Sequence, residues 1–294
     1  MPALTAAAAT QPQLFLFLGD NVYADTDDAA QLQRCYDTLG ARTEFRQLRA
    51  TTPIEAVWDD HDFGRNDVGK EYPIATASQR IFLDFFEVAA DDPRRSRPGT
   101  YATRMLDDQT QLVLLDTRQF RDPLTLKTGP IEPAALGRRG PYTGGPGTVL
   151  GETQWAWLEE TLKQPAKRRL VASSIQVIAN EHGFEKWGLF PAERERLLDL
   201  LFGCDGDVLV LSGDRHHGEI NRLDRDGRSL WELTASSLNK PTGWKNERNP
   251  HRVGSRYLGA NFGHVAIDPG SGGMTLRILN DRGTAMLQAE AFGE

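Results

Sequence analysis

The run Leu14-Phe15-Leu16-Phe17-Leu18, followed directly by Gly19-Asp20-Asn21, is the stretch from which the fold of this 294-residue chain can be worked out. A short run that is apolar at every position is typical of a strand buried on both faces of a sheet. Ligand sites in α/β sheets form beyond the carboxyl ends of the strands. The stretch therefore predicts a buried strand that carries a functional residue, Asp20, at its end.

Polar clusters follow three other apolar runs in the same way. They are Asp59-Asp60-His61-Asp62 after 54–58, Asp116-Thr117-Arg118 after 111–115, and Gly213-Asp214-Arg215-His216-His217 after 207–211. Carboxylates together with His and Tyr side chains suit hard or borderline metal ions. Each cluster alone has an ordinary explanation as a turn, a helix cap or a surface pair. Their recurrence at four strand ends favours one shared metal site.

The remaining pattern changes character along the chain. Apolar residues at helical spacing predict helices over 28–50, 74–89 and 152–164 and from Pro191. The last third instead shows strands joined by hairpin turns, for example at Asp226-Gly227. We therefore expect a single domain over residues 1–294 with an α/β front and a β-rich back, built from two packed sheets with outer helices.

The composition excludes several classes of protein. Hydrophobic residues make up 39% of the chain and charged residues 26%, which rules out a disordered or collagen-like chain. No run of 18 apolar residues exists, so we expect no membrane-spanning helix. A net charge of −7 argues against a general nucleic-acid surface. Two cysteines, Cys35 and Cys204, cannot form a disulfide scaffold.

The strand-end residues can be arranged into a site that holds two metal ions. Such a site needs a carboxylate that bridges the ions, and Asp20 is the natural candidate. The other candidate ligands are Asp60, Asp214 and His216, with a further oxygen from Asn66 or Tyr23. The ions would polarise a phosphoryl oxygen and make hydroxide available near neutral pH.

Two further residues fit the same chemistry. His61 is placed to protonate a leaving alkoxide or to donate a hydrogen bond to a phosphate oxygen. Arg118 can bind a phosphate through two parallel hydrogen bonds. The chain contains neither a Walker-type phosphate loop nor a Gly-x-Ser-x-Gly nucleophile elbow.

These motifs resemble the alkaline phosphatase D (PhoD-like) family of the calcineurin-like metallophosphoesterase superfamily. The resemblance covers essentially the whole chain in the right order. It rests on the stretches Gly19-Asp20-Asn21-Val22-Tyr23-Ala24-Asp25, 58–67 (WDDHDFGRND), Leu115-Asp116-Thr117-Arg118 and 212–217 (SGDRHH), together with 181–191 (EHGFEKWGLFP) and 233–239 (LTASSLN).

The resemblance implies a four-layer αββα sandwich and a metal-dependent phosphoesterase site. It implies that Asp20 bridges the ions, that Tyr23 binds iron as a tyrosinate, and that Asp60 and His61 serve as metal ligand and catalytic histidine. It places Asn66 near the second ion, and Asp214 and His216 as further ligands that favour calcium for one ion. The substrate-side residues that it suggests, beside Arg118, are His182, Trp187 and His217.

One departure from the family pattern concerns the start of the chain. Relatives open with a strand ending in Gly-Ser-Cys or an equivalent, whose last residue binds a metal, and neither Cys35 nor Cys204 has a matching position. We therefore expect a domain that lacks this first strand through truncation, so that a leader for export to the periplasm or beyond would lie upstream.

Three functions stay open on the sequence alone. The first is a metal-dependent phosphatase or phosphodiesterase acting on small phosphoesters, with iron and calcium as candidate ions. The second is a homologue that binds metal or phosphate without turnover because one ligand is missing. The third is a hydrolase of another ester, since the loops at 122–150 and 236–261 would set specificity.

Overall fold

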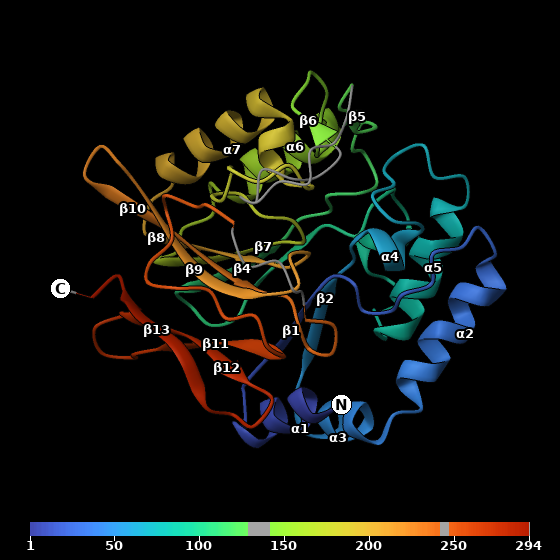
Figure 1. Cartoon of the computed structure of the whole chain (residues 1–294), viewed down its shortest axis with the longest axis horizontal. Coiled ribbons are helices and arrows are strands. Elements are labelled where there is room, and N and C mark those ends of the chain that lie inside the picture. Colours follow the sequence, from blue (N-terminus) through green and yellow to red (C-terminus); the bar gives the residue numbers. More distant parts are fainter. Residues whose placement is uncertain (129–141, 242–246, 294) are drawn as a thin grey trace.

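A six-stranded mixed sheet forms the centre of the computed structural model, which describes residues 1–128, 142–241 and 247–293 (Figure 1). Its strands lie in the order β3 (Ala102–Met105), β4 (Thr110–Leu114), β7 (Arg168–Ser173), β8 (Asp207–Ser212), β10 (Arg228–Ala235) and β9 (Gly218–Arg225). The four inner strands are parallel to one another, and both edge strands are antiparallel to their neighbours. The carboxyl ends of β4, β7, β8 and β10 therefore meet at one edge of the sheet.

A second group of strands covers one face of this sheet. It consists of the parallel pair β1 (Phe15–Leu18) and β2 (Ile54–Val57) and of the antiparallel strands β11 (Asn261–Ile267), β12 (Met274–Asn280) and β13 (Ala285–Ala291). Leu112 and Leu114 of β4 pack in one apolar cluster with Val57 and Leu276 from this group. Residues of both sheets therefore fill the layer between them.

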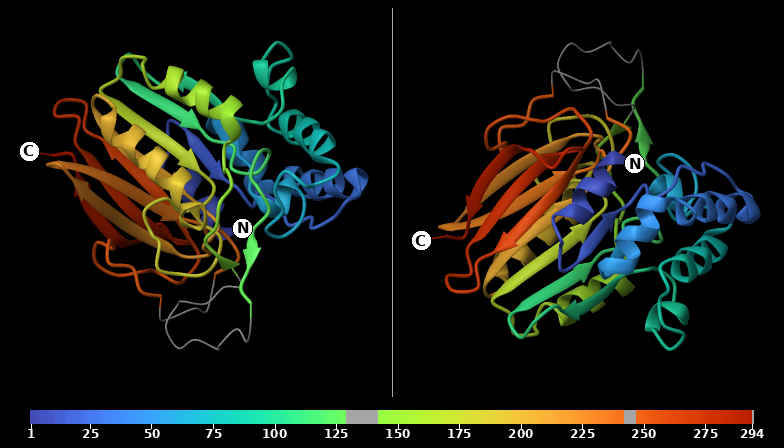
Figure 2. Two further views of the ribbon diagram at one scale, coloured as in Figure 1. Left: turned by 90° about the horizontal axis from the view of Figure 1, so that it is seen from above. Right: turned by 90° about the horizontal axis from the view of Figure 1, so that it is seen from below.

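Two helices cover the opposite face, α6 (Gly151–Thr161) and α7 (Pro191–Gly203) (Figure 2). Val113, which alternates with Leu112 and Leu114 along β4, joins Leu158 of α6 and Leu197 of α7 in a separate apolar cluster. Strand residues point alternately to the two faces, so β4 is buried on both. All five of its residues are buried, including the polar Thr110 and Gln111.

The remaining helices pack around β1 and β2. They are α1 (Pro2–Ala9), α2 (Ala29–Gly40), α3 (Thr43–Thr51), the short α4 (Asp60–Phe63) and α5 (Ala75–Phe85). Leu4 of α1, Phe45 of α3 and Phe82 of α5 share a cluster with Phe17 of β1. The described part is thus a mixed α/β fold with helices on one face of the central sheet and further strands and helices on the other.

Two sequence expectations need correction. The helix predicted over 28–50 is two helices, because α2 ends at Gly40 and Arg42 is extended at the start of α3. Glycine is a poor helix former. The run 14–18 does form strand β1, but Phe15, Leu16 and Leu18 are only half-buried. Within the described residues β1 pairs with β2 alone, which leaves its other edge without a strand neighbour.

The loop predicted over 122–150 contains a small hairpin. It is formed by β5 (Thr125–Leu126) and β6 (Tyr142–Thr143), and residues 129–141 between them lie outside the described part. Two short 3-10 helices, η1 (Pro93–Arg95) and η2 (Trp187–Leu189), complete the elements. None of the helices in the described ranges combines the length and apolar character needed to cross a bilayer.

Candidate metal centre

Two glycines bring the strand ends of the two sheets close together. A Cβ on Gly213, after β8, would lie 2.5 Å from the carbonyl oxygen of Leu18 at the end of β1. A Cβ on Gly19 would lie 2.4 Å from Cβ of Asp59, and Gly19 has a φ of +100°. Side chains at either position would separate these loops. The glycines thus allow the residues that follow, among them Asp20 and Asp214, to approach one another.

Tyr23 joins the loop after β1 to the loop after β8. Its hydroxyl donates a hydrogen bond of 3.0 Å to Oδ2 of Asp20 and lies 3.1 Å from Nε2 of His216. His216 Nε2 is also 3.8 Å from Oδ2 of Asp20. The structure therefore brings together three residues that the sequence assigns to one site.

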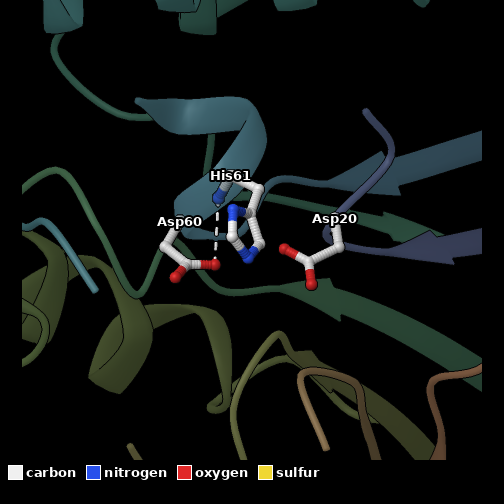
Figure 3. A group of neighbouring side chains, drawn as sticks. All are labelled: Asp20, Asp60 and His61. Atoms are coloured by element: carbon white, nitrogen blue, oxygen red, sulfur yellow. Dashed lines mark hydrogen bonds between the residues drawn. The ribbon is translucent and has the colours of Figure 1, made fainter. Parts of the chain in front are cut away.

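Asp60 and His61, at the start of α4, complete the same centre. A carboxylate oxygen of Asp20, one of Asp60 and a ring nitrogen of His61 all lie within 4.8 Å of one another. Figure 3 shows the imidazole between the two carboxylates. Asp60 is held by two backbone groups, because its Oδ1 accepts from the His61 N–H at 2.9 Å and its Oδ2 from the Asp67 N–H at 2.6 Å.

Several site residues have a left-handed backbone, which is unusual for residues other than glycine. The φ angles are +50° at Asp20, +45° at Asp25, +58° at Asp67, +64° at Asp214 and +55° at His216. Such conformations cost free energy and cluster at sites where the surrounding structure imposes them. Their concentration in these loops supports a functional centre rather than an ordinary set of turns.

The centre carries an excess of buried negative charge. Burial raises the pKa of Asp20 well above its ordinary value, and the carboxylates of Asp60 and Asp59 raise it further. Burial likewise raises the pKa of Asp214, an effect that Arg215 partly offsets. Among the described residues, neither Asp20 Oδ1 nor Asp214 Oδ2 has a hydrogen-bond partner. Buried carboxylate oxygens without partners are costly unless a cation binds them.

The donor set fits metal ions for this reason. Carboxylates, a phenol oxygen and an imidazole nitrogen converge, and each can bind a hard or borderline cation. The imidazole of His216 is prepared for this role, because its Nδ1 lies 2.7 Å from the carbonyl oxygen of Lys240. This hydrogen bond places the proton on Nδ1 and leaves the lone pair of Nε2 directed at Tyr23 and Asp20.

Asp25 is a site residue that the sequence analysis quoted in a motif but assigned no role. Its Oδ1 lies 2.7 Å from Nδ1 of His61 and accepts a hydrogen bond of 3.0 Å from the Asn66 N–H. The sequence feature that points to Asp25 as a site residue is its position five residues after Asp20 in the same strand-end loop. The contact shows that Asp25 fixes the orientation of the His61 ring.

Arg118 occupies a different place from the one expected for a phosphate ligand. Its side chain is 0% exposed. It forms ion pairs with Asp59 and, at 2.6 Å, with Glu185, which also pairs with Arg121 at 2.9 Å. A guanidinium enclosed by two carboxylates holds the loops together beneath the centre. This placement does not support direct contact between Arg118 and a substrate.

The other three residues expected to contact a substrate are buried as well. His182 is 4% exposed, and Trp187 and His217 are 0% exposed. Trp187 donates from Nε1 to Ser173 at 2.9 Å, and His182 Nε2 lies 3.1 Å from Oε1 of Gln176. The sequence alone does not distinguish a motif residue that supports a loop from one that faces a ligand. In the structure Trp187 and His182 contact other protein residues, and neither ring nitrogen of His217 has a hydrogen-bond partner among the described residues.

Asn66 also differs from its expected position near an ion. Its side chain is exposed, and its Nδ2 donates to Oδ2 of the neighbouring Asp67 at 2.5 Å. Asp67 is instead the residue that approaches Asp60, in a group with Glu185. Because two arginines already neutralise Glu185, this second group is less suited to an ion than the centre at Asp20.

Comparisons with known proteins indicate a family and a fold for the chain. The sequence profile described as PhoD-like phosphatase matches residues 1–278. A solved structure described as PhoD has a TM-score of 0.72 at 16% identity, over 98% of this chain and 65% of that chain. GAP50, described as the anchor in the inner membrane complex of Plasmodium, has a TM-score of 0.63 at 12% identity, over 100% of this chain and 84% of that chain.

The extent of these matches limits what they show. The chain spans 65% of the length of the PhoD chain that it matches. At such low identities the two structures show a shared mixed α/β fold and no more. A search of curated protein sequences gives no match.

Proposed function

The chain belongs to the PhoD-like phosphatase family, and we propose that it is a metal-dependent phosphoesterase that hydrolyses phosphomonoesters, phosphodiesters or both. In this proposal residues 1–294 form one four-layer αββα metallophosphoesterase domain. The site lies where the loops after β1, β2 and β8 meet. Its substrate is a small phosphoester.

The observation that carries this proposal is the pair of unsatisfied carboxylate oxygens at the centre. Asp20 Oδ1 and Asp214 Oδ2 lack hydrogen-bond partners in the described structure, and both residues lie among further carboxylates. A positively charged group would relieve this repulsion, since an opposite charge within a few ångströms stabilises an ionised carboxylate. Arg215 lies 3.8 Å from Asp214 Oδ2, beyond hydrogen-bond distance, and among the described residues no arginine forms an ion pair with Asp20.

We propose Asp20, Tyr23, Asp60, Asp214 and His216 as the residues that hold two or more ions. Carboxylate oxygens suit calcium, and a phenolate oxygen suits iron. When bound, the ions would supply Lewis-acid polarisation of a phosphoryl oxygen and would make a water molecule more acidic. Tyr23 is protonated without them, because burial and the Asp20 carboxylate raise the pKa of its phenol.

The chain's own residues supply the proton chemistry. The hydrogen bond from His61 Nδ1 to Asp25 orients the ring, so the other ring nitrogen is the one that can serve the substrate. In the protonated state it would donate a proton to the oxygen of the leaving alcohol. Before that transfer Asp25 would stabilise the imidazolium form of His61, as a carboxylate beside a histidine does in other hydrolytic sites, and the ring would be neutral afterwards.

The test is hydrolysis of aryl phosphate monoesters and diesters by the full chain after metal removal and separate re-addition of calcium, iron and manganese. Elemental analysis reports the bound ions, and Asp20→Asn serves as the site variant. Turnover that depends on added metal and is lost in Asp20→Asn is the expected result. If the protein holds stoichiometric metal and phosphate but shows no turnover, the alternative holds instead: a homologue that binds metal or phosphate without catalysing hydrolysis.

A further inference from the structure

Lys240 lies just beyond β10 and contacts two of the proposed metal ligands. Its backbone carbonyl oxygen accepts the hydrogen bond from His216 Nδ1 at 2.7 Å. Its Nζ lies 3.7 Å from the centre of the Tyr23 ring. The hydroxyl at the far end of that ring contacts Asp20 and His216. The ammonium group thus lies against the ring whose hydroxyl contacts Asp20 and His216.

Lys240 can offer its positive charge to a bound anion, whereas the nearby arginines already form ion pairs with carboxylates. Arg118 and Arg121 are fully buried and form ion pairs with carboxylates. Arg215 is buried and forms an ion pair with Glu247 at 2.8 Å. Lys240 is exposed, and within the described ranges its ammonium forms no ion pair with a carboxylate. A contact with an aromatic face leaves a cation its full charge.

We propose that Lys240 binds the phosphoryl oxygens of the substrate and favours dianionic phosphomonoesters over monoanionic phosphodiesters. This inference rests on the proposed function and names the substrate class of that site. A monoester carries nearly two negative charges at neutral pH, because its second pKa is about 6. The attraction to one ammonium rises with the charge of the partner, so the monoester gains more.

The position of Lys240 suits a role in substrate binding, so the preference for phosphomonoesters should be seen in KM and in the Kd of phosphate. Tyr23 and His61 have ring centres 4.3 Å apart, so the ammonium and the proposed proton donor lie against the same tyrosine ring. A lysine acts as a compact, mobile point charge toward phosphate. It can therefore follow an incoming phosphoryl group without disturbing the buried carboxylates behind it.

The experiment compares Lys240→Met, Lys240→Arg and the wild type as metal-loaded full chains. Methionine keeps the aliphatic contact with the Tyr23 ring and removes the charge, and arginine restores the charge. Lys163→Met is the matched control, because Lys163 is exposed on the far helical layer beside Glu160. The measurements are kcat and KM for an aryl monoester and an aryl diester, and the Kd of inorganic phosphate at low and high salt.

For Lys240→Met we expect the monoester KM and the phosphate Kd to rise about tenfold, which corresponds to the loss of one charged contact. The diester KM should change by less than about threefold, and high salt should reduce the difference between the variants. Lys240→Arg should restore most of the monoester affinity, and Lys163→Met should match the wild type.

The outcomes separate this inference from the function on which it rests. A wild type that hydrolyses esters, combined with a Lys240→Met variant of unchanged phosphate affinity or of equal loss for both substrates, overturns the role of Lys240 alone. If the wild type binds phosphate without turnover, the Kd values decide the inference. If the metal-loaded wild type neither binds phosphate nor hydrolyses any ester, both proposals fail.

Discussion

His61 Nδ1 lies 2.7 Å from Oδ1 of Asp25, which connects helix α4 to the loop after β1. The same carboxylate oxygen accepts the Asn66 N–H. A single carboxylate therefore sets the ring orientation of the proposed proton donor and the path of the segment after α4. The two ends of this contact lie 36 residues apart in sequence, and the parallel pairing of β1 with β2 brings them together.

Asp25→Asn is expected to lower kcat by about 10- to 100-fold, the range typical for loss of a carboxylate that orients a histidine. An amide stabilises a neighbouring imidazolium less than a carboxylate does, so proton donation by His61 should be slower. Steady-state kinetics across pH is the measurement. Asp27→Asn is the control, since Asp27 pairs with Arg65 in an exposed contact, and equal losses in both variants would contradict the assignment.

Metal ions should stabilise the folded protein through the unsatisfied carboxylates. A ligand at one hundred times its Kd adds about 2.7 kcal/mol to the free energy of unfolding. Thermal unfolding with and without added ions is therefore expected to show a higher Tm with metal for the wild type. Asp20→Asn and Asp214→Asn should abolish that shift. Their metal-free forms should be at least as stable as the metal-free wild type, because each loses a buried charge. An undiminished metal shift in either variant would count against the proposed ligand set.

Arg118→Met distinguishes a structural role from substrate contact. Removing one partner of a buried ion pair typically costs about 3–5 kcal/mol of folding free energy, because the other charge is left buried. We expect a loss of this order in denaturant unfolding. Arg196→Met should change stability by less than about 1 kcal/mol, since its pairs with Glu152 and Glu159 are at the surface. A normally stable Arg118→Met protein with only a raised KM would restore the sequence-based assignment.

Lys186 predicts a specific pH dependence of stability. Burial lowers its pKa from 10.5 to about 8, with Arg215 adding to the effect. Between these values the unfolded chain binds more protons than the folded chain, so this group's contribution to folding stability rises with pH. The gain is about 3 kcal/mol at most.

Lys186→Met lacks that contribution. As the pH rises from 8 to 10.5, the free energy of unfolding of the wild type should therefore increase relative to that of the variant. Denaturant unfolding at several pH values measures it. Parallel pH curves for the two proteins would show that the lysine titrates normally.

The sequence predicted several residues that the structure brings close together, because strand ends follow a local rule. Asp20 and Asp60 stand after the paired strands β1 and β2, and His216 stands after β8 of the six-stranded sheet. Arg118 and Trp187, which the sequence suggested as substrate contacts, are buried in the structure. Both are set in motifs beside the site, and nothing in the local pattern distinguishes a supporting side chain from an exposed one.

What the sequence by itself determined is the identity and order of the elements and the residues that end their strands, since apolar periodicity and strand-end chemistry act over short distances. Only the tertiary structure decided how the side chains are partnered. Asp25 reaches His61, Lys240 reaches Tyr23, and Glu185 draws Arg118 inward. Each of these contacts joins residues from different loops, whose separation depends on how the strands pair and how the sheets pack, and not on any local pattern.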